Sequence, residues 1–295
     1  MAVPDTVPEF ALTGSMAPSP APPSLTVRSF GLTDRGRVRA VNEDQFVILD
    51  LARTLHVRQT SVSQAKNQYG SHRGQVFVVA DGMGGHQAGE TASAISVLTV
   101  EGFLLNTLKK FFHEQRSEEH SVMQEFRSAL LEADARIFEE ANQHPEMIGM
   151  GTTLTMAFAV NRRLLVAHAG DSRCYLLSGG KLQRLTQDHT LVAEMLKYGA
   201  VSPEEASRHP YRHVITNALG GNKQGVQVDM HRLDLEAGDV VMLCSDGLSE
   251  MVLDERIAAI LFEEQEPQQA CERLVTAANE RGGTDNITVI VARFE

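Results

Sequence analysis

The sequence predicts an α+β fold, and three observations support this. Apolar runs of strand length alternate with longer segments in which apolar residues recur every three or four positions. These segments follow one another without the regular strand–helix–strand rhythm of a doubly wound parallel sheet. The chain has 295 residues, of which 42% are hydrophobic and 22% charged, so it is long enough to bury the core of a globular protein.

A single folded domain is expected over residues 25–295. The first 24 residues hold six of the ten prolines and no lysine or arginine, which predicts a disordered tail over 1–24. Periodic sequence then continues to the end of the chain without a second linker-like stretch.

Six apolar runs have the length of β-strands. Several of them are nearly continuous rather than alternating, so we expect both faces of the sheets to be covered. The predicted strands are 45–50, 76–81, 154–160, 164–170, 240–245 and 287–294.

Helices are predicted from apolar stripes and capping signals. The segment 120–142 has a stripe spaced by three or four residues, which indicates a face packed on the core. Ser202, Pro203 and Glu205 form a capping box with proline at the first helical position, which predicts a short helix. The other predicted helices are 87–109, 254–262 and 267–280, and the stripe consists of Val122, Phe126, Leu130, Ala133 and Ile137.

Charge and cysteine usage exclude several classes of function. The formal net charge of -11 repels nucleic acid and anionic lipid, so neither is expected as a partner. Cys174, Cys244 and Cys271 lie far apart without C-x-x-C spacing, which argues against a disulfide framework or a thiolate zinc site. We interpret them as small core residues, two in strands and Cys271 on a helix. The longest uninterrupted apolar run, 257–262, is too short to span a membrane, so a cytoplasmic protein is expected.

The positions of four aspartates carry the chemical prediction. Asp81, Asp171 and Asp246 each end an apolar run, and Asp285 lies two residues before the last one. Two of the four precede a glycine, and an Asp-Gly pair taken alone favours a simple turn. Four carboxylates at strand ends can converge across a sheet, where they repel one another unless a cation lies among them.

The identity of the cation follows from the ligand atoms. Carboxylates and a glycine carbonyl suit Mg²⁺ or Mn²⁺, whereas zinc usually recruits histidine or cysteine. Two such cations sharing a carboxylate acidify a water molecule and hold a phosphoryl oxygen during in-line attack. The pattern therefore predicts hydrolysis of a phosphoester.

Eight short motifs, taken together in their order and spacing, resemble the metal-dependent type 2C (PPM) serine/threonine protein phosphatases in their bacterial form. They cover nearly all of 25–295, and they imply a four-layer α-β-β-α sandwich of two mostly antiparallel sheets flanked by helix pairs. The motifs are GLTDRGRVRAVNEDQF, ADGMGGHQAGE, GTTLTMAF, AHAGDSRCYLL, LTQDHTLVAEMLKYGAVSPEEA, ITNALG, LCSDGLSE and GGTDNITVIV.

The resemblance implies a binuclear Mn²⁺ or Mg²⁺ centre at one end of the sandwich. Asp81 is expected to bridge both ions, with the main-chain carbonyl of Gly82 on one of them. Asp246 and Asp285 are expected to bind the other ion.

Further residues match supporting positions of the family. Asp44 is expected to hold the metal waters in place, with Glu43 beside it as a second acidic candidate. Asp171 matches the position of a third, weaker ion that Asp246 completes.

Two residues match the positions that handle the substrate. Arg39 is expected to bind the substrate phosphate, because a guanidinium pairs with two phosphate oxygens, although a surface arginine is the alternative. His86 is expected to be the general acid that protonates the leaving alkoxide; the alternative is a polar loop histidine. The implied reaction is direct attack on phosphorus by a metal-bridging hydroxide, without a phosphoenzyme.

Two segments concern substrate choice. The segment 186–220 resembles the flap beside the metal centre of bacterial members, and its positive charge either attracts phosphopeptides or is incidental to a solvated loop. The segment 51–75 is interpreted as an insertion, either a strand pair or loop near the substrate entrance or a tolerated surface excursion. The basic and histidine residues of the flap are Arg208, His209, Arg212 and His213.

The favoured function is a protein serine/threonine phosphatase that opposes a serine/threonine kinase and acts as a monomer on phosphoserine and phosphothreonine proteins. The alternatives are a catalytically silent phosphoprotein-binding module and a phosphatase of small phosphoesters. A silent module would be expected to lack a metal carboxylate, whereas all four of Asp44, Asp81, Asp246 and Asp285 are present. This favours an enzyme.

Overall fold

The computed structural model of the chain describes residues 25–53, 72–84, 87–111, 116–222 and 224–295. The predicted tail over 1–24, most of the predicted insertion, and His86 lie outside the described residues. At the edges of that insertion the two flanking strands continue as a pair, with Arg53 opposite His72.

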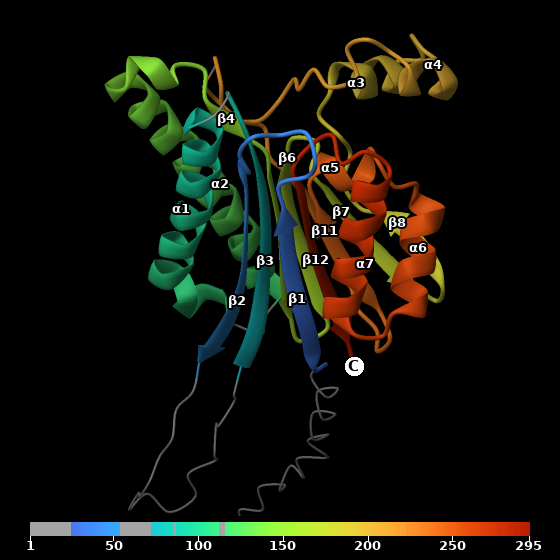
Figure 1. Cartoon of the computed structure of the whole chain (residues 1–295). Helices are drawn as coiled ribbons and strands as arrows, with labels where there is room; N and C mark the ends of the chain where they lie inside the picture. Colours follow the sequence, from blue (N-terminus) through green and yellow to red (C-terminus); the bar gives the residue numbers. More distant parts are fainter. Residues whose placement is uncertain (1–24, 54–71, 85–86, 112–115, 223) are drawn as a thin grey trace, which may run out of the picture.

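Two antiparallel sheets form the centre of the molecule (Figure 1). All pairings between the described strands are antiparallel. The first sheet has the order β1 (Val27–Asp34), β12 (Ile287–Phe294), β11 (Val240–Cys244), β7 (Arg173–Ser178) and β8 (Lys181–Arg184). The second has the order β10 (Asp229–Asp234), β6 (Arg163–Ala169), β5 (Leu154–Val160), β3 (His72–Met83), β4 (Gly151–Thr152) and β9 (Leu219–Gly220), with β2 (Asp44–Arg53) paired to β3.

Helix pairs cover the two outer faces of this sandwich, and smaller helices lie at one end. In Figure 1 the pair α1 and α2 packs on the seven-stranded sheet, and α6 and α7 pack on the five-stranded sheet. The predicted four-layer α-β-β-α architecture is confirmed. The helices are α1 (Gln87–Phe111), α2 (Arg116–Gln143), α3 (Leu191–Lys197), α4 (Pro203–Ser207), α5 (Asp246–Ser249), α6 (Asp254–Glu263) and α7 (Pro267–Glu280), with a 3₁₀ turn over Pro145–Met147.

Strand β3 shows why the apolar runs are continuous. Val76, Val78 and Ala80 pack under α1 and α2, whereas Phe77 and Val79 between them pack in the core that joins the two sheets. Because alternate side chains of a strand point to opposite faces, a strand covered on both sides needs apolar residues at every position. The same division holds for β11 and β12.

The predicted helical stripe and capping box are confirmed. All five stripe residues of α2 are buried. At α4 the Ser202 Oγ accepts a hydrogen bond from the Glu205 N–H at 3.3 Å, and the Glu205 carboxylate accepts one from the Ser202 N–H at 2.8 Å. The three cysteines are buried as predicted, two in strands and Cys271 on α7.

Helix α1 contains a predominantly apolar stretch that is longer than the uninterrupted apolar run 257–262. Residues Ala88–Asn106 are long and apolar enough to cross a membrane by length and composition, and 44% of that stretch is buried inside the molecule. Ala92, Val100 and Leu104 of this helix pack against the sheet with little or no exposed surface. The stretch is therefore a core helix of the sandwich.

Candidate metal centre

The sheets bring the predicted aspartates to one end of the sandwich. Asp44 at the start of β2 lies directly opposite Asp81 near the end of β3. Asp246 follows β11, and Asp285 precedes its neighbour β12 in the other sheet. Asp171 lies in the connection from β6 to β7. Residues far apart in the sequence are thus gathered by the antiparallel pairing of strands in two sheets.

Four of these five aspartates, all but Asp44, line a cleft of about 740 Å³. Asp44 is buried behind the lining, opposite Asp81 in the sheet, with only 2% of its surface exposed. The remaining lining comes from the connections around the aspartates and from the flap. Predicted site residues that line the cleft are Arg39, Glu43, Asp81, Gly82, Asp171, Asp246 and Asp285.

Three of the aspartates have a buried carboxylate oxygen without a hydrogen-bond partner among the described residues. These atoms are Oδ1 of Asp44, Oδ1 of Asp171 and Oδ1 of Asp246. A buried carboxylate oxygen that accepts no hydrogen bond is costly, and nearby negative charge adds to the cost. A hard divalent cation removes both costs, so the donor set fits the predicted ions.

Burial and mutual repulsion raise the pKa values of the clustered aspartates. Burial raises the pKa of Asp81 well above its usual range, and Asp44 and Asp246 raise it further. Burial likewise raises the pKa of Asp246, with added repulsion from Asp171 and Asp285. The pKa of Asp171 rises to about 7 through burial and the charge of Asp188. Without a cation, the positive charges and hydrogen-bond donors around the cluster therefore do not compensate its negative charge.

Asp44 is held in place by hydroxyl groups from the opposite sheet. Its Oδ2 accepts hydrogen bonds from Ser245 Oγ at 2.8 Å and Thr288 Oγ1 at 2.7 Å. Burial raises the pKa of Asp44 to about 6, while these two hydrogen bonds act to lower it. Neither hydroxyl residue was identified from the sequence alone. Their positions, Ser245 directly before Asp246 and Thr288 in the last strand, are the features of the sequence that point to them.

Asp81 is fixed through its main chain by the next strand pair. Its N–H donates to Thr153 Oγ1 at 3.1 Å, and its carbonyl accepts from the Thr153 N–H and the Thr152 hydroxyl, both at 2.9 Å. These threonines belong to the GTTLTMAF motif, for which the sequence alone predicts no role of individual residues. They hold the Asp81 backbone rigidly.

The two Asp-Gly pairs are not simple turns. Neither Gly82 nor Gly247 has a positive φ. A Cβ at Gly82 would lie 2.2 Å from the Gly89 carbonyl oxygen, and one at Gly247 would lie 2.0 Å from the Asn286 carbonyl oxygen. Glycine is required because another backbone segment packs against it.

The predicted substrate residues are only partly placed. Arg39 lines the cleft with 53% of its side chain exposed, and its Nη2 donates to Asp285 Oδ2 at 2.7 Å. The guanidinium therefore lies beside the predicted metal ligands. His86 is outside the described residues, and the structure does not place its imidazole.

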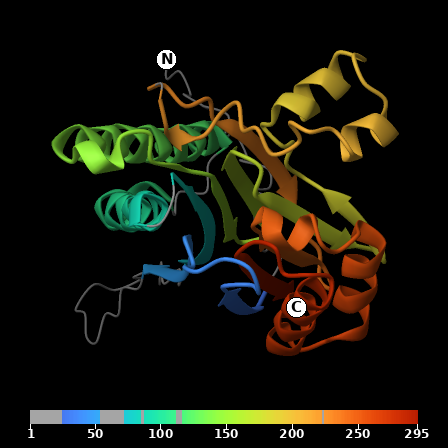
Figure 2. The same ribbon diagram turned by 45° about the horizontal axis from the view of Figure 1, so that its top comes forward.

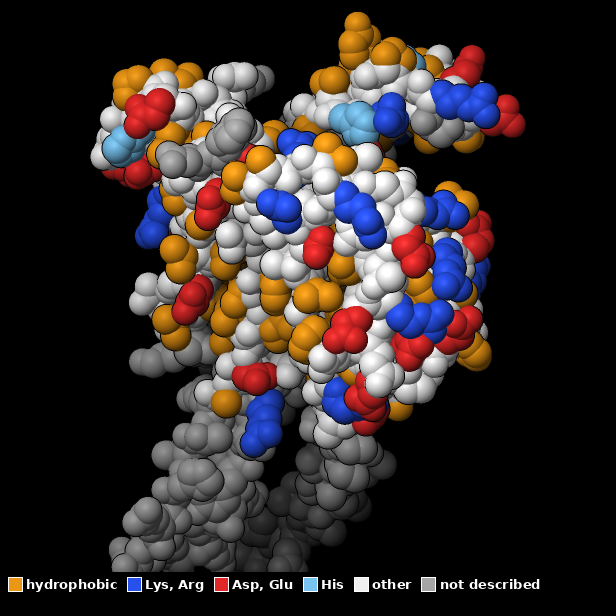
Figure 3. Space-filling model, in the orientation of Figure 1, with side chains coloured by type: hydrophobic (Ala, Val, Ile, Leu, Met, Phe, Trp, Pro, Cys, Tyr) orange, Lys and Arg blue, Asp and Glu red, His pale blue; other side chains and the backbone are white. Residues whose placement is uncertain are grey.

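The predicted flap lies beside the cleft. Helices α3 and α4 project at one end of the sandwich, away from both outer helix pairs (Figure 2), and the surface carries basic and histidine side chains there (Figure 3). Arg212 and His213 from this segment line the cleft. The flap is anchored through His189, whose Nδ1 accepts a hydrogen bond from the Gly170 N–H at 3.1 Å, next to Asp171.

Comparison with known proteins agrees with this architecture. Residues 54–280 match the family model for protein phosphatase 2C. The serine/threonine phosphatase stp of Listeria welshimeri is 34% identical over 259 residues, covering 88% of this chain and 92% of that protein.

Two solved structures share the fold over most of the chain. The Mycobacterium tuberculosis serine/threonine phosphatase PstP/Ppp is 33% identical, with a TM-score of 0.73 over 90% of this chain and 98% of that one. The catalytic domain of PstP in complex with two manganese ions is 32% identical, with a TM-score of 0.72 over 92% of this chain and 99% of that one. The chain therefore belongs to the protein phosphatase 2C family and is a serine/threonine phosphatase.

Proposed function

We propose that the aspartate cluster is a binuclear Mn²⁺ or Mg²⁺ centre that removes phosphate from phosphoserine and phosphothreonine in proteins. The observation that carries this is the convergence of four aspartates in one cleft, where Asp171 and Asp246 each keep a buried carboxylate oxygen without a partner among the described residues. Asp44, opposite Asp81, has a third such oxygen. An arginine lies beside these aspartates in the same cleft. The manganese complex of the related PstP domain supports the choice of cation.

Three aspartates and one main-chain carbonyl would hold the two ions. Asp81 would be shared between two ions, with the Gly82 carbonyl on one side and Asp246 with Asp285 on the other. When bound, the ions would acidify a water molecule and neutralise charge on the phosphate. The rigid backbone of Asp81 supports this assignment, because a shared ligand must be held in a fixed position.

Other acidic residues would support the centre. Asp44 would orient metal-bound water through its unpartnered Oδ1, while its Oδ2 stays fixed by Ser245 and Thr288. Asp171 and Asp246 would hold a third, weaker ion, which their unpartnered oxygens support.

Arg39 and His86 would act on the substrate. The Arg39 guanidinium would exchange its bond to Asp285 for two phosphate oxygens when substrate and ions are bound. His86 would donate a proton to the leaving serine or threonine oxygen, a task suited to a group that titrates near neutral pH.

The cellular setting of the enzyme is part of the same proposal. We place it in the cytoplasm as a monomer that opposes a serine/threonine kinase, with the kinase or its substrates as phosphoprotein partners. The chain's formal net charge of -11 and three buried, unpaired cysteines support a reducing compartment without nucleic-acid partners.

The test is Mn²⁺-dependent phosphate release from a phosphothreonine peptide. We expect release by the whole chain, loss with EDTA, and loss in Asp81→Asn and Asp246→Asn. Asp234→Asn, which changes an exposed aspartate at the sheet edge, is the matched control and should remain active. Tight peptide binding without release from any phosphopeptide or p-nitrophenyl phosphate would favour the binding module instead. Release from p-nitrophenyl phosphate alone would favour a phosphatase of small phosphoesters.

A further inference from the structure

We propose that His213, Asp246 and Glu250 form an additional site for a divalent metal of the Zn²⁺ class, which ties the flap to the body of the enzyme. The site extends the proposed function, because Asp246 is shared with the aspartate centre. It differs from that centre in having a nitrogen ligand and in joining two parts of the molecule.

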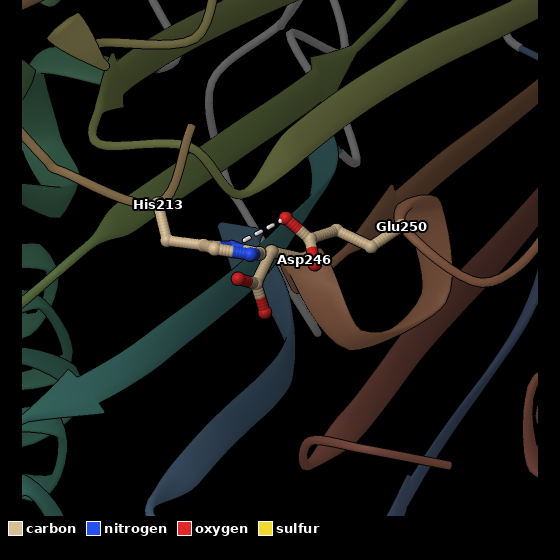
Figure 4. Close-up of side chains that lie close together, drawn as sticks. All are labelled: His213, Asp246 and Glu250. Atoms are coloured by element: carbon tan, nitrogen blue, oxygen red, sulfur yellow. Dashed lines mark ion pairs between the residues drawn. The ribbon is translucent and has the colours of Figure 1, made fainter. Parts of the chain in front are cut away.

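The three side chains already converge (Figure 4). One ligand atom from each of them lies within 4.8 Å of the others. His213 Nδ1 is 2.7 Å from Glu250 Oε1. Ligands about 2.0–2.1 Å from a tetrahedral zinc ion lie about 3.3 Å apart, so small movements of the side chains would complete the site.

Two of the ligands come from a single helical turn. Asp246 begins α5 and Glu250 follows it four residues later, and the Glu250 N–H donates to the Asp246 carbonyl at 2.8 Å. Side chains four residues apart lie on the same face of a helix, so two carboxylates there repel each other. The ligand atom available at this place is the unpartnered Oδ1 of Asp246, which the proposed third ion would also use, so zinc would compete with that weaker ion.

The third ligand is carried by a fixed part of the flap. The residue after His213 is Val214, whose carbonyl accepts a hydrogen bond from the Leu191 N–H at 2.8 Å. Ile215 forms a β-bridge with Thr190 at the opposite base of the flap. The His213 backbone is therefore held, and its half-exposed imidazole needs only a rotation of the side chain to adjust.

Another histidine between acidic residues shows what distinguishes this cluster. His144 has the same side-chain exposure as His213, 46%. Its Nε2 faces Glu140 at 3.3 Å, while its Nδ1 faces Glu146 at 3.5 Å. One ion cannot use both carboxylates together with a single ring nitrogen in that arrangement. His144 is therefore the matched control for an exposed histidine beside glutamates.

A metal at this site would join two parts of the cleft wall. His213 belongs to the flap and Glu250 to the body, and both line the cleft that contains Arg39 and the aspartates. An ion bound to both would hold them at one separation. Zinc would thus restrict access of phosphoproteins and protect the flap from proteases.

The experiment uses the full chain in excess Mg²⁺, which occupies the all-oxygen sites, and adds increasing Zn²⁺ during equilibrium dialysis. Bound zinc and magnesium are measured together by elemental analysis. We expect one zinc per chain, with loss of at most the one weakly bound magnesium that shares Asp246. Removal of a ligand in His213→Ala should weaken zinc binding at least about tenfold, since loss of outer-shell partners alone costs about 10–100-fold. His144→Ala should bind as the wild type does.

Limited proteolysis supplies a second readout. Zinc should slow cleavage within the flap of the wild type and of His144→Ala, and should leave cleavage of His213→Ala unchanged. Equal zinc affinity in the wild type and His213→Ala, or zinc uptake accompanied by loss of more than one magnesium per chain, would overturn the proposal. Neither readout depends on phosphate release, so a failure of the phosphatase assay would be recognised separately.

Discussion

The metal-free protein should be stabilised by Asp171→Asn. Asp171 is a buried carboxylate with only 8% of its surface exposed, and its Oδ1 has no hydrogen-bond partner among the described residues. Burial and the neighbouring Asp188 raise its pKa from 3.8 to about 7. Asparagine has nearly the same shape but no charge, so it removes the cost of ionising this position.

The magnitude and its sign follow from proton linkage. Because the folded-state pKa is raised, the folded protein binds more protons than the unfolded chain between about pH 4 and 7, and stability falls as pH rises through this window. A shift of about three pKa units corresponds to about 4 kcal/mol at pH 7 for an isolated group. Coupling to the other aspartates reduces this, so we expect a gain of about 2–4 kcal/mol at pH 7 and less than about 1 kcal/mol near pH 4.

The assay is urea unfolding of wild type and Asp171→Asn in EDTA at a series of pH values. The difference in unfolding free energy should grow as pH rises from 4 to 7. Excess Mn²⁺ should abolish or reverse the advantage of the variant, because the wild-type carboxylate then has a cation to bind. Equal stability at pH 7, or a gain independent of pH, would refute the argument that uncompensated negative charge defines the cluster.

Four other substitutions test separate parts of the structure. In Gly247→Ala the new Cβ would lie 2.0 Å from a backbone oxygen, so the unfolding free energy should fall by about 1–3 kcal/mol. Gly102 lies inside α1 with nothing within 4 Å of an added Cβ, so Gly102→Ala should raise the unfolding free energy by about 0.5–1 kcal/mol. Urea denaturation measures both changes. Arg39→Lys should raise KM for a phosphopeptide about tenfold, because lysine cannot pair with two phosphate oxygens, and unchanged steady-state kinetics would exclude that role. Thr288→Val removes a hydrogen bond to Asp44 and should weaken Mn²⁺ binding measured by calorimetry, with identical affinity counting against the assigned support.

The sequence predicted most of the buried elements of the fold, but its list of strands lacked the buried strand β7 and the strand β1. Strand β12 and helix α7 have the predicted bounds, because each shows a clear apolar pattern between polar flanks. Strand β10 was missed, since it lies at a sheet edge and its residues are polar and partly exposed. Helix α3 was missed as well, because its seven residues bury only Val192.

The sequence predicted the charged residues of the site but not the polar residues that hold them in place. Aspartates at strand ends stand out in a sequence, and the structure places them around one cleft. Ser245 and Thr288 do not stand out, because their hydrogen bonds to Asp44 depend on how the two sheets pack. The proximity of His213 to Glu250 likewise depends on where the flap returns to the body. Such contacts arise from tertiary structure and leave no local pattern.

The most direct test of the account is anomalous diffraction at the manganese edge from crystals of the whole chain grown with Mn²⁺. We expect two manganese ions in the cleft that share the Asp81 carboxylate, with Asp246 and Asp285 as ligands at about 2.0–2.2 Å. A cleft without manganese, or manganese bound without Asp81, would contradict the central claim that these aspartates form the catalytic metal centre.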